Sequence, residues 1–290
     1  MVPSIPLAII ESIETHTRST FRGFSFASGG CINHGGKLTT SGNVYFLKWN
    51  DLNKFPGMFE AEARGLTLLR NADALSVPEV IHVGSVGSYQ FLLLQHIETS
   101  GNIPGYWNDF GRGLALLHRH SATDFGLDHD NYIGSLPQRN QRAASWAGFF
   151  VEQRLRVQLQ MAHDHGKIDK KVLKEFDSLF PKLSSFFPEE PPALLHGDLW
   201  GGNIMATSAG DPCLIDPAVY YGHREADLAM TQLFGGFDSS FLNAYREVYP
   251  LETGWEERLD LYNLYPLLVH VNLFGGGYAN QVVSILKRFV

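Results

Sequence analysis

The stretch that decides the fold reads His-Gly-Asp-Leu-Trp-Gly-Gly-Asn over residues 196–203 and Leu-Ile-Asp-Pro-Ala over residues 214–218. It places Asp198 five residues before Asn203, and Asp216 follows thirteen residues after Asn203. Phosphoryl transfer needs a carboxylate that accepts a hydroxyl proton and oxygen ligands that hold magnesium against the nucleotide phosphates. Kinases provide these groups as a catalytic Asp, an Asn and a later Asp. The stretch therefore predicts Asp198 as the catalytic base and Asn203 and Asp216 as the magnesium ligands.

The remaining parts of a kinase site lie upstream in the expected order. Lys48 lies in the strand-like run 44–49, among bulky apolar residues. Apolar residues recur at helical spacing over residues 57–72, which predicts an amphipathic helix there. In kinases a strand lysine paired with a helix glutamate holds the α and β phosphates. We expect Glu62 to be this partner, because Glu60 would point away by about half a helical turn.

A glycine-rich segment, Ser-Gly-Gly-Cys-Ile-Asn-His-Gly-Gly over residues 28–36, precedes Lys48. Glycine lets a backbone approach phosphate groups closely. We therefore expect Gly29 and Gly30 to cover the nucleotide. Two Gly-Gly pairs are also common in ordinary hairpins, so this segment gains its meaning from the lysine that follows it.

Each of these residues on its own has an ordinary structural interpretation. Lys48 would be a solvated strand lysine, Glu62 a surface helix residue, and Asp216 the cap of a turn before Pro217. We interpret His196 as a hydrogen-bonded core histidine rather than as a catalytic group. Only the joint order and spacing of the lysine, the glutamate and the three loop residues favours a kinase site.

The sequence resembles the fructosamine-kinase (ketosamine-3-kinase) family over almost the whole chain. The resemblance rests on the loop at residues 195–203 and on Ile-Asp-Pro-Ala-Val-Tyr-Tyr-Gly-His-Arg-Glu-Ala-Asp-Leu-Ala-Met at residues 215–230. Within this second stretch, residues 220–230 are specific to the family, whereas antibiotic and choline kinases share the His-Gly-Asp loop. Shorter stretches are also similar to the family: residues 29–33, 58–62, 125–127, 131–134, 138–140 and 272–278.

The resemblance implies a protein-kinase-like enzyme that uses ATP and Mg²⁺. Its expected activity is phosphorylation of a sugar hydroxyl, the 3-hydroxyl, of a fructosamine or related ketoamine such as glycated lysine. This is a deglycation-repair type of reaction. The same resemblance places adenine at a hinge near Gln95 and Ile97, which would bind it through backbone groups.

Further residues near the loop are candidates for substrate contact or for support of the site. Trp200, two residues after the expected base, either stacks on a sugar ring or packs the loop. Tyr221 and His223, with Arg224 beside them, are further candidates for substrate contact. Asp227 is expected to hold the catalytic-loop backbone by hydrogen bonds, as an acid at this place does in kinase-like folds.

The departures from the protein-kinase pattern favour a small-molecule kinase. Gly197 stands where protein kinases place an Arg, and Pro217-Ala218 follows Asp216 in place of Phe-Gly.

Two alternatives remain. One is another small-molecule kinase of the same fold, of the aminoglycoside or choline type, and the other is a non-catalytic nucleotide-binding module. The second is disfavoured because the base, the metal ligands and the lysine are all present.

We predict an α+β, bilobal, protein-kinase-like fold with a boundary between residues 98 and 99. The N-terminal lobe, residues 1–98, would bind the nucleotide with an antiparallel sheet and one internal helix. Its elements are expected to be a leading helix at 4–16 and strands at 21–27, 36–39, 43–49, 79–84 and 88–95.

Breaker residues at 100–105 mark the change to the larger, mainly helical lobe of residues 99–290, which would carry catalysis and substrate binding. Apolar spacing predicts one helix over 110–117 and another over 146–159. A hairpin of two short strands, 204–205 and 213–215, would bring Asn203 and Asp216 to facing edges.

Composition and length exclude several classes of protein. Hydrophobic residues make up 44% of the chain, yet no apolar run approaches the roughly 20 residues that span a bilayer. The start lacks the basic residues of a signal peptide and soon reaches Glu11. With 30 acidic and 23 basic side chains, nucleic acid is not an expected partner. Two cysteines suit a reducing cytosol, so we expect a cytoplasmic protein without a membrane partner.

Cys31 lies inside the glycine-rich segment, one residue after Gly30. It is either a compact apolar residue required by the loop or a reactive thiol, since phosphate-binding amides favour a thiolate. Cys213 is expected on a buried strand, too far away to pair with it. Some members of the resembled family carry a cysteine at this loop position. The expectation is therefore a monomer, or a redox-linked homodimer joined through Cys31.

Overall fold

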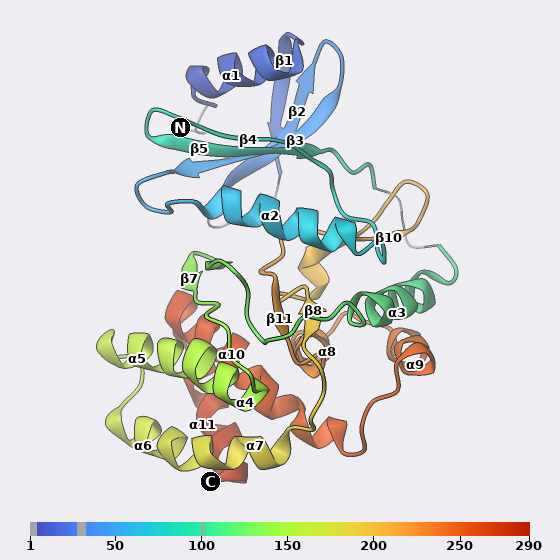
Figure 1. Ribbon diagram of the computed structural model, residues 1–290. Helices are drawn as coiled ribbons and strands as arrows, with labels where there is room; N and C mark the ends of the chain where they lie inside the picture. The colour runs from blue at the N-terminus through green and yellow to red at the C-terminus, as the bar shows by residue number, and fades with distance from the viewer. Residues whose placement is uncertain (1–4, 28–32, 100, 102) are drawn as a thin grey trace.

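The computed structural model describes residues 5–27, 33–99, 101 and 103–290. A sheet-rich part is followed by a mainly helical part, and the chain passes once from the first to the second (Figure 1). Gly29, Gly30 and Cys31 lie outside the described residues, so their expected roles stay predictions.

The N-terminal part is built around a five-stranded antiparallel sheet in the order β1-β2-β3-β5-β4. The helix and strand predictions for this part are confirmed to within a few residues. The leading helix begins at Leu7, after Pro6. The elements are α1 (Leu7–Thr17), β1 (Phe21–Phe26), β2 (His34–Thr40), β3 (Val44–Asp51), α2 (Met58–Asn71), β4 (Val80–Val86) and β5 (Tyr89–Gln95).

Alternation along β3 decides which side chains face which helix. Successive strand residues point to opposite faces of a sheet. Tyr45, Leu47 and Trp49 join a buried cluster with Ile9 of α1. The intervening residues, Lys48 among them, therefore face α2, which covers the other side of the sheet (Figure 1). The period of two in the sequence thus directs the lysine toward the helix that carries Glu62.

The C-terminal part consists of helices with three pairs of short strands between them in the described residues. Its first half contains α3 (Tyr106–Leu117), β6 (Asn131–Ile133), β7 (Leu136–Gln138), α4 (Trp146–Phe149), a π-helical segment (Phe150–Leu155), α5 (Arg156–Asp164), α6 (Lys170–Leu179), a 3₁₀ turn (Phe180–Lys182) and α7 (Leu183–Phe186). Its second half contains β8 (Ala193–Leu195), a 3₁₀ turn (Gly201–Asn203), β9 (Ile204–Ala206), β10 (Pro212–Leu214), β11 (Tyr220–Gly222), α8 (Glu225–Leu233), α9 (Ser239–Val248), α10 (Trp255–Phe274) and α11 (Tyr278–Phe289).

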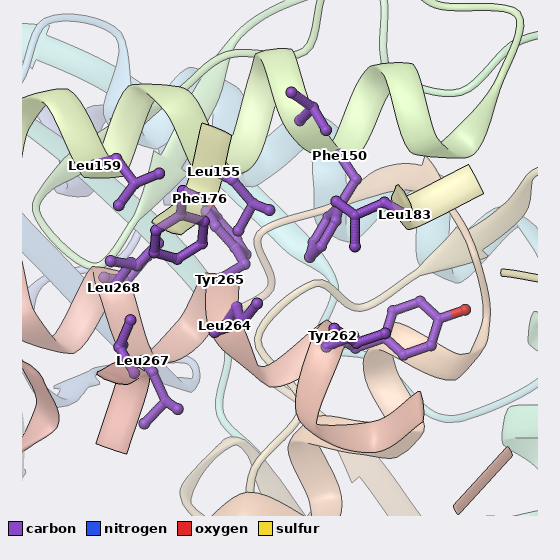
Figure 2. Packing of buried hydrophobic residues seen from close by; sticks show 14 of the residues in the cluster. Phe150, Leu155, Leu159, Phe176, Leu183, Tyr262, Leu264, Tyr265, Leu267 and Leu268 are labelled. Atoms are coloured by element: carbon purple, nitrogen blue, oxygen red, sulfur yellow. The ribbon is translucent and has the colours of Figure 1, made fainter. Parts of the chain in front are cut away.

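Helix α10 forms the centre of the C-terminal part and contacts α5, α8 and α11. Figure 2 shows Leu264, Tyr265 and Leu268 of this helix facing Leu155 and Leu159. All five side chains belong to one buried apolar cluster. Within the described ranges, every helix is either too short or too polar to cross a membrane.

The helix predicted over residues 146–159 is continuous but not regular. The predicted helix is confirmed, and a π-helical segment at Phe150–Leu155 separates α4 from α5. The wider turn accompanies Arg154, which is fully buried and whose Nη2 donates to Oδ1 of Asn140 at 2.7 Å. The apolar periodicity of the sequence did not indicate this segment.

One buried cluster crosses from the sheet-rich part into the helical part. It includes Leu66 of α2, Leu92 of β5, Leu114 of α3 and Leu214 of β10. The expected hairpin is confirmed as β9 and β10, with Cys213 opposite Met205. The β9–β10 hairpin therefore shares a buried cluster with α2 and β5. The proposed boundary between residues 98 and 99 stays a prediction.

Candidate active site

Lys48 joins the two parts of the molecule through two carboxylates. Its Nζ lies 2.7 Å from Oε1 of Glu62 and 2.6 Å from Oδ1 of Asp216. Burial alone would lower the pKa of Lys48, but the two carboxylates outweigh burial and hold that pKa above its ordinary value. The lysine is therefore charged, and Glu62 rather than Glu60 is its helical partner, as helical geometry predicted.

The catalytic-loop backbone is held by Asp227, at the start of α8. Its Oδ2 accepts from the backbone N–H of His196 at 2.7 Å, and its Oδ1 accepts from that of Gly197 at 2.9 Å. Nε2 of His118 lies 3.3 Å from Oδ2 as well. These are the hydrogen bonds that the sequence predicted for this acid, and they satisfy a carboxylate that is almost fully buried.

His196 is a hydrogen-bonded core histidine. Its Nδ1 accepts from the backbone N–H of Asp198 at 3.2 Å, so its Nε2 carries the proton and donates to the carbonyl of Ile215 at 2.9 Å. Burial lowers the pKa of His196, which keeps the ring neutral. The imidazole therefore joins the residue before Asp216 to the loop that carries Asp198.

The local structure explains why glycine stands at position 197, where protein kinases have an arginine. Its φ is +81°, in the left-handed region that favours glycine. A Cβ at this position would lie 2.1 Å from the carbonyl oxygen of Ala218. The backbone N–H of Ala218 also donates to the carbonyl of His196 at 2.9 Å. The two catalytic segments thus approach each other too closely for any side chain at residue 197.

Asp198 and Asn203 meet inside the loop. Nδ2 of Asn203 donates to Oδ2 of Asp198 and to the backbone carbonyl of the same residue, both at 2.9 Å. Burial raises the pKa of Asp198 to about 7, and the nearby Asp216 and Asp227 add to this rise against the opposing Asn203 hydrogen bond. A carboxylate poised near neutrality suits a general base.

Asn203 and Asp216 offer oxygen atoms of the type that Mg²⁺ prefers. Because Nδ2 of Asn203 is engaged by Asp198, its Oδ1 is the oxygen left to face a cation. Asp216 is exposed and has a φ of +54°, an uncommon backbone conformation that Asp tolerates better than most residues. The backbone N–H of Ile215 donates to the carbonyl of Asn203 at 3.0 Å, which holds the two ligand positions together.

A buried amide network supports the segment after Asp216. Nδ2 of Asn131 donates to the carbonyl of Val219 at 2.8 Å. Nε2 of Gln138 donates to the carbonyl of Ala218 at 3.1 Å and to Oδ1 of Asn131 at 2.8 Å. The family-like stretches at residues 131–134 and 138–140 therefore position the segment that follows Asp216.

A recess that is partly open to solvent lies beside Asp198. Part of its lining lies in stretches that the sequence analysis singled out, at residues 131–134, 195–203 and 215–230. The remaining lining residues come mostly from α10 and follow no catalytic pattern, and the family-like stretch at residues 272–278, just after His270, was the nearest signal for them. The lining side chains include Asp198, Tyr220, Asp227, Met230, Tyr262, Tyr265 and His270.

The three expected substrate residues have different surroundings. Trp200 is 41% exposed and meets Phe234 edge-on, with ring centroids 6.4 Å apart, so it remains free to contact a ligand. Tyr221 follows Tyr220 on β11, and alternation turns it to the face opposite the recess-lining Tyr220. Tyr220 is therefore better placed than Tyr221 to face the recess.

His223 lies in the core rather than at the recess. Its side chain is fully buried, and its Nδ1 lies 3.1 Å from the hydroxyl of Tyr262. Neighbouring Arg224 makes a bidentate pair with Glu190, with both distances 2.7 Å. This placement corrects the expectation of substrate contact for His223. The family-specific stretch carries these residues because buried ion pairs anchor α8, which in turn carries Asp227.

The expected hinge follows the end of β5. Gln95 is the last residue of that strand, and its backbone N–H donates to the carbonyl of Glu79 at 2.8 Å. Ile97 lies just beyond the sheet and is half-buried. The structure therefore places both residues on the connection between the two parts, and their contact with adenine stays a prediction.

Comparison with known proteins agrees with this geometry. Residues 7–290 match the family model described as Fructosamine kinase. A probable ketoamine kinase of Synechocystis sp. is 41% identical over 265 residues, covering 90% of this chain and 88% of that protein. A chloroplastic protein-ribulosamine 3-kinase of Arabidopsis thaliana is 39% identical over 269 residues, covering 90% and 81%.

Solved structures share the architecture. A crystal structure named as a candidate fructosamine-3-kinase from Thermobifida fusca has a TM-score of 0.87 at 33% identity and covers 97% of each chain. An aminoglycoside phosphotransferase, with a TM-score of 0.66 at 16% identity, shares the fold alone. The fold and the site thus define a bilobal, protein-kinase-like phosphotransferase that uses ATP. Within that class, the chain belongs to the fructosamine kinase family, as its sequence predicted.

Proposed function

We propose that the chain transfers the γ-phosphoryl group of ATP to a sugar hydroxyl, the 3-hydroxyl, of a ketoamine such as a fructosamine on lysine. The observation that carries this proposal is the joint placement of Lys48, Glu62 and Asp216 beside the Asp198–Asn203 pair. Relatives named ketoamine kinase and protein-ribulosamine 3-kinase support this substrate class. The reaction would serve deglycation repair.

Each residue has a role that its chemistry supports. Asp198 would accept or orient the proton of the attacking hydroxyl, since burial brings its pKa to about 7. Lys48, fixed by Glu62, would hold the α and β phosphates. Asn203 and Asp216 would hold Mg²⁺, which supplies charge neutralisation of the phosphate oxygens when bound.

The remaining predicted contacts belong to nucleotide and substrate binding. The backbone near Gln95 and Ile97 would bind adenine, and Gly29 and Gly30 would cover the phosphates. Trp200 would stack on the sugar, which its exposed ring beside the catalytic loop supports. We place these contacts in a nucleotide-binding lobe of residues 1–98 and a catalytic lobe of residues 99–290, in a cytoplasmic protein.

The proposal also covers self-association. Cys213 is fully buried, and burial raises the pKa of its thiol to about 12, which makes it unreactive. A disulfide through Cys31 would therefore link two chains. After mild oxidation, the parent should run as a dimer on a non-reducing gel and Cys31→Ala should not. A parent that stays monomeric would exclude the redox-linked homodimer.

The decisive experiment measures ATP turnover with a panel of acceptors. Free fructosamines and ribulosamines should be phosphorylated, and the product should carry phosphate on the 3-hydroxyl. An aminoglycoside and choline serve as controls for other kinases of the same fold. Turnover of the last two only would contradict the ketoamine assignment, and no turnover of any acceptor with intact ATP binding would favour a non-catalytic nucleotide-binding module.

A further inference from the structure

His270 lies in the last turns of α10 and lines the recess beside Asp198. Its Nδ1 lies 2.8 Å from the backbone carbonyl of Pro266. A carbonyl can only accept, so Nδ1 must carry the proton and donate. The other ring nitrogen, Nε2, is then a hydrogen-bond acceptor. Burial lowers the pKa of His270, which keeps this acceptor unprotonated at neutral pH.

Aromatic rings border this histidine on several sides. The ring centroids of Phe234 and Tyr278 each lie 4.9 Å from that of His270, and that of Phe274 lies 5.4 Å away. Phe234 also meets Trp200 of the catalytic loop. Phe234 and Phe274 are 40% and 61% exposed, so the ring cluster is open to a ligand. The faces of such rings attract cations.

The other polar groups of the recess are already engaged. Both carboxylate oxygens of Asp227 accept backbone hydrogen bonds from the catalytic loop. The hydroxyl of Tyr262 bonds to His223, that of Tyr265 donates to Gln138 at 2.6 Å, and that of Tyr220 hydrogen-bonds to Arg154. In the proposed function, Asp198 contacts the reacting hydroxyl. Among the described side chains that line this recess, Nε2 of His270 is therefore the acceptor that remains for another group of the substrate.

The chemistry of a ketoamine identifies that group. Its nitrogen is attached to C1 and its reacting hydroxyl to C3, so four bonds separate the two and they lie roughly 3 to 5 Å apart. When the hydroxyl reaches Asp198, the nitrogen must lie in or beside the same recess. At neutral pH this secondary amine is protonated, so it carries both a positive charge and N–H donors.

We propose that His270 selects ketoamines over neutral sugars, because its Nε2 accepts a hydrogen bond from the substrate ammonium while Phe234 and Tyr278 offer it their ring faces. This assignment rests on the proposed function. It adds a specificity-determining residue outside the kinase loop. It also gives a function to an acceptor with a fixed tautomer in the lining of the recess.

The test pairs two variants with two substrates. His270→Phe keeps a ring of similar size but removes the acceptor, and His270→Gln restores an acceptor oxygen. The substrates are an N-butyl fructosamine and the 1-O-butyl ether of fructose, which is the neutral analogue. For the amine, His270→Phe should lower kcat/KM about 10- to 100-fold, the range of a lost hydrogen bond to a charged group.

For the ether, the same variant should change kcat/KM by less than about threefold, and the KM for ATP should stay the same. His270→Gln should recover part of the loss on the amine. Equal losses of His270→Phe on both substrates would mean that the ring only packs the recess, and would overturn the assignment while leaving the proposed function intact. A parent enzyme that phosphorylates neither compound nor any other ketoamine would overturn the proposed function itself.

Discussion

The ammonium group of Lys48 lies 2.6 Å from a carboxylate oxygen of Asp216, although 168 residues separate the two in sequence. This contact spans the sheet-rich and helical parts and places the proposed phosphate-binding cation beside the proposed metal ligand.

Replacing Asp216 should separate metal binding from folding. Asp216→Asn removes the negative charge of a proposed metal ligand. We therefore expect nucleotide affinity measured with Mg²⁺ to fall at least about tenfold, together with turnover. Nucleotide affinity without Mg²⁺ should change little. The exposed turn residue Asp211 provides the control, since Asp211→Asn should behave like the parent. If Asp216→Asn binds Mg-ATP as the parent does, the metal assignment is wrong.

Replacing Asp198 should affect chemistry rather than binding. Asp198→Asn removes the proton acceptor but keeps the shape of the side chain, so turnover should fall about 10²- to 10⁴-fold. Nucleotide affinity, measured by titration calorimetry, should stay close to that of the parent. An equal loss of affinity and rate would indicate that the residue supports folding instead.

The pH profile should show an acidic limb set by the same carboxylate. The base must be ionised, and burial raises the pKa of Asp198 to about 7, so kcat/KM should fall as the pH is lowered through that region. A nearby cation favours the ionised form, so saturating Mg²⁺ should move the limb to lower pH. The residual rate of Asp198→Asn should lack the limb. A parent rate that is flat down to pH 5 would contradict this prediction.

Asp227 should matter for both stability and turnover. In Asp227→Asn the amide keeps one acceptor oxygen, while its NH₂ group would face a backbone N–H of the catalytic loop. A buried donor left unpaired costs about 1–3 kcal/mol, so the Tm should fall. Turnover should fall as well, because the loop that carries Asp198 loses its anchor. A thermal melt and a rate measurement test this prediction. An unchanged Tm would show that the catalytic loop keeps its conformation without the Asp227 carboxylate.

Gly197 should not tolerate any side chain. A Cβ there would overlap the carbonyl oxygen of Ala218 at 2.1 Å, on a backbone with positive φ. Gly197→Ala should therefore lower the Tm and reduce turnover at least about tenfold, since a small misplacement at a catalytic centre is costly. Gly201→Ala is the matched control in the same loop, because its Cβ would come no closer than 3.8 Å to a neighbour. Equal behaviour of the two variants would refute the steric argument.

The sequence by itself determined the residues whose roles depend on short-range geometry. The spacing of Asp198, Asn203 and Asp216 is a property of one loop and one hairpin, and the structure brings their elements together as that spacing predicted. The preference for Glu62 over Glu60 follows from the helical period alone. The family-specific stretch could also be recognised from the sequence, since its pattern lies in consecutive residues.

Only the tertiary structure decided which aromatic and histidine side chains face the recess. His223 and Tyr221 stand in the family-specific stretch, yet the core buries the first and strand alternation turns the second away. His270 and Tyr265 reach the recess from α10, more than 60 residues beyond the catalytic loop. Such placements arise when distant helices pack together, and no local period or spacing in a single sequence encodes which of their faces will meet.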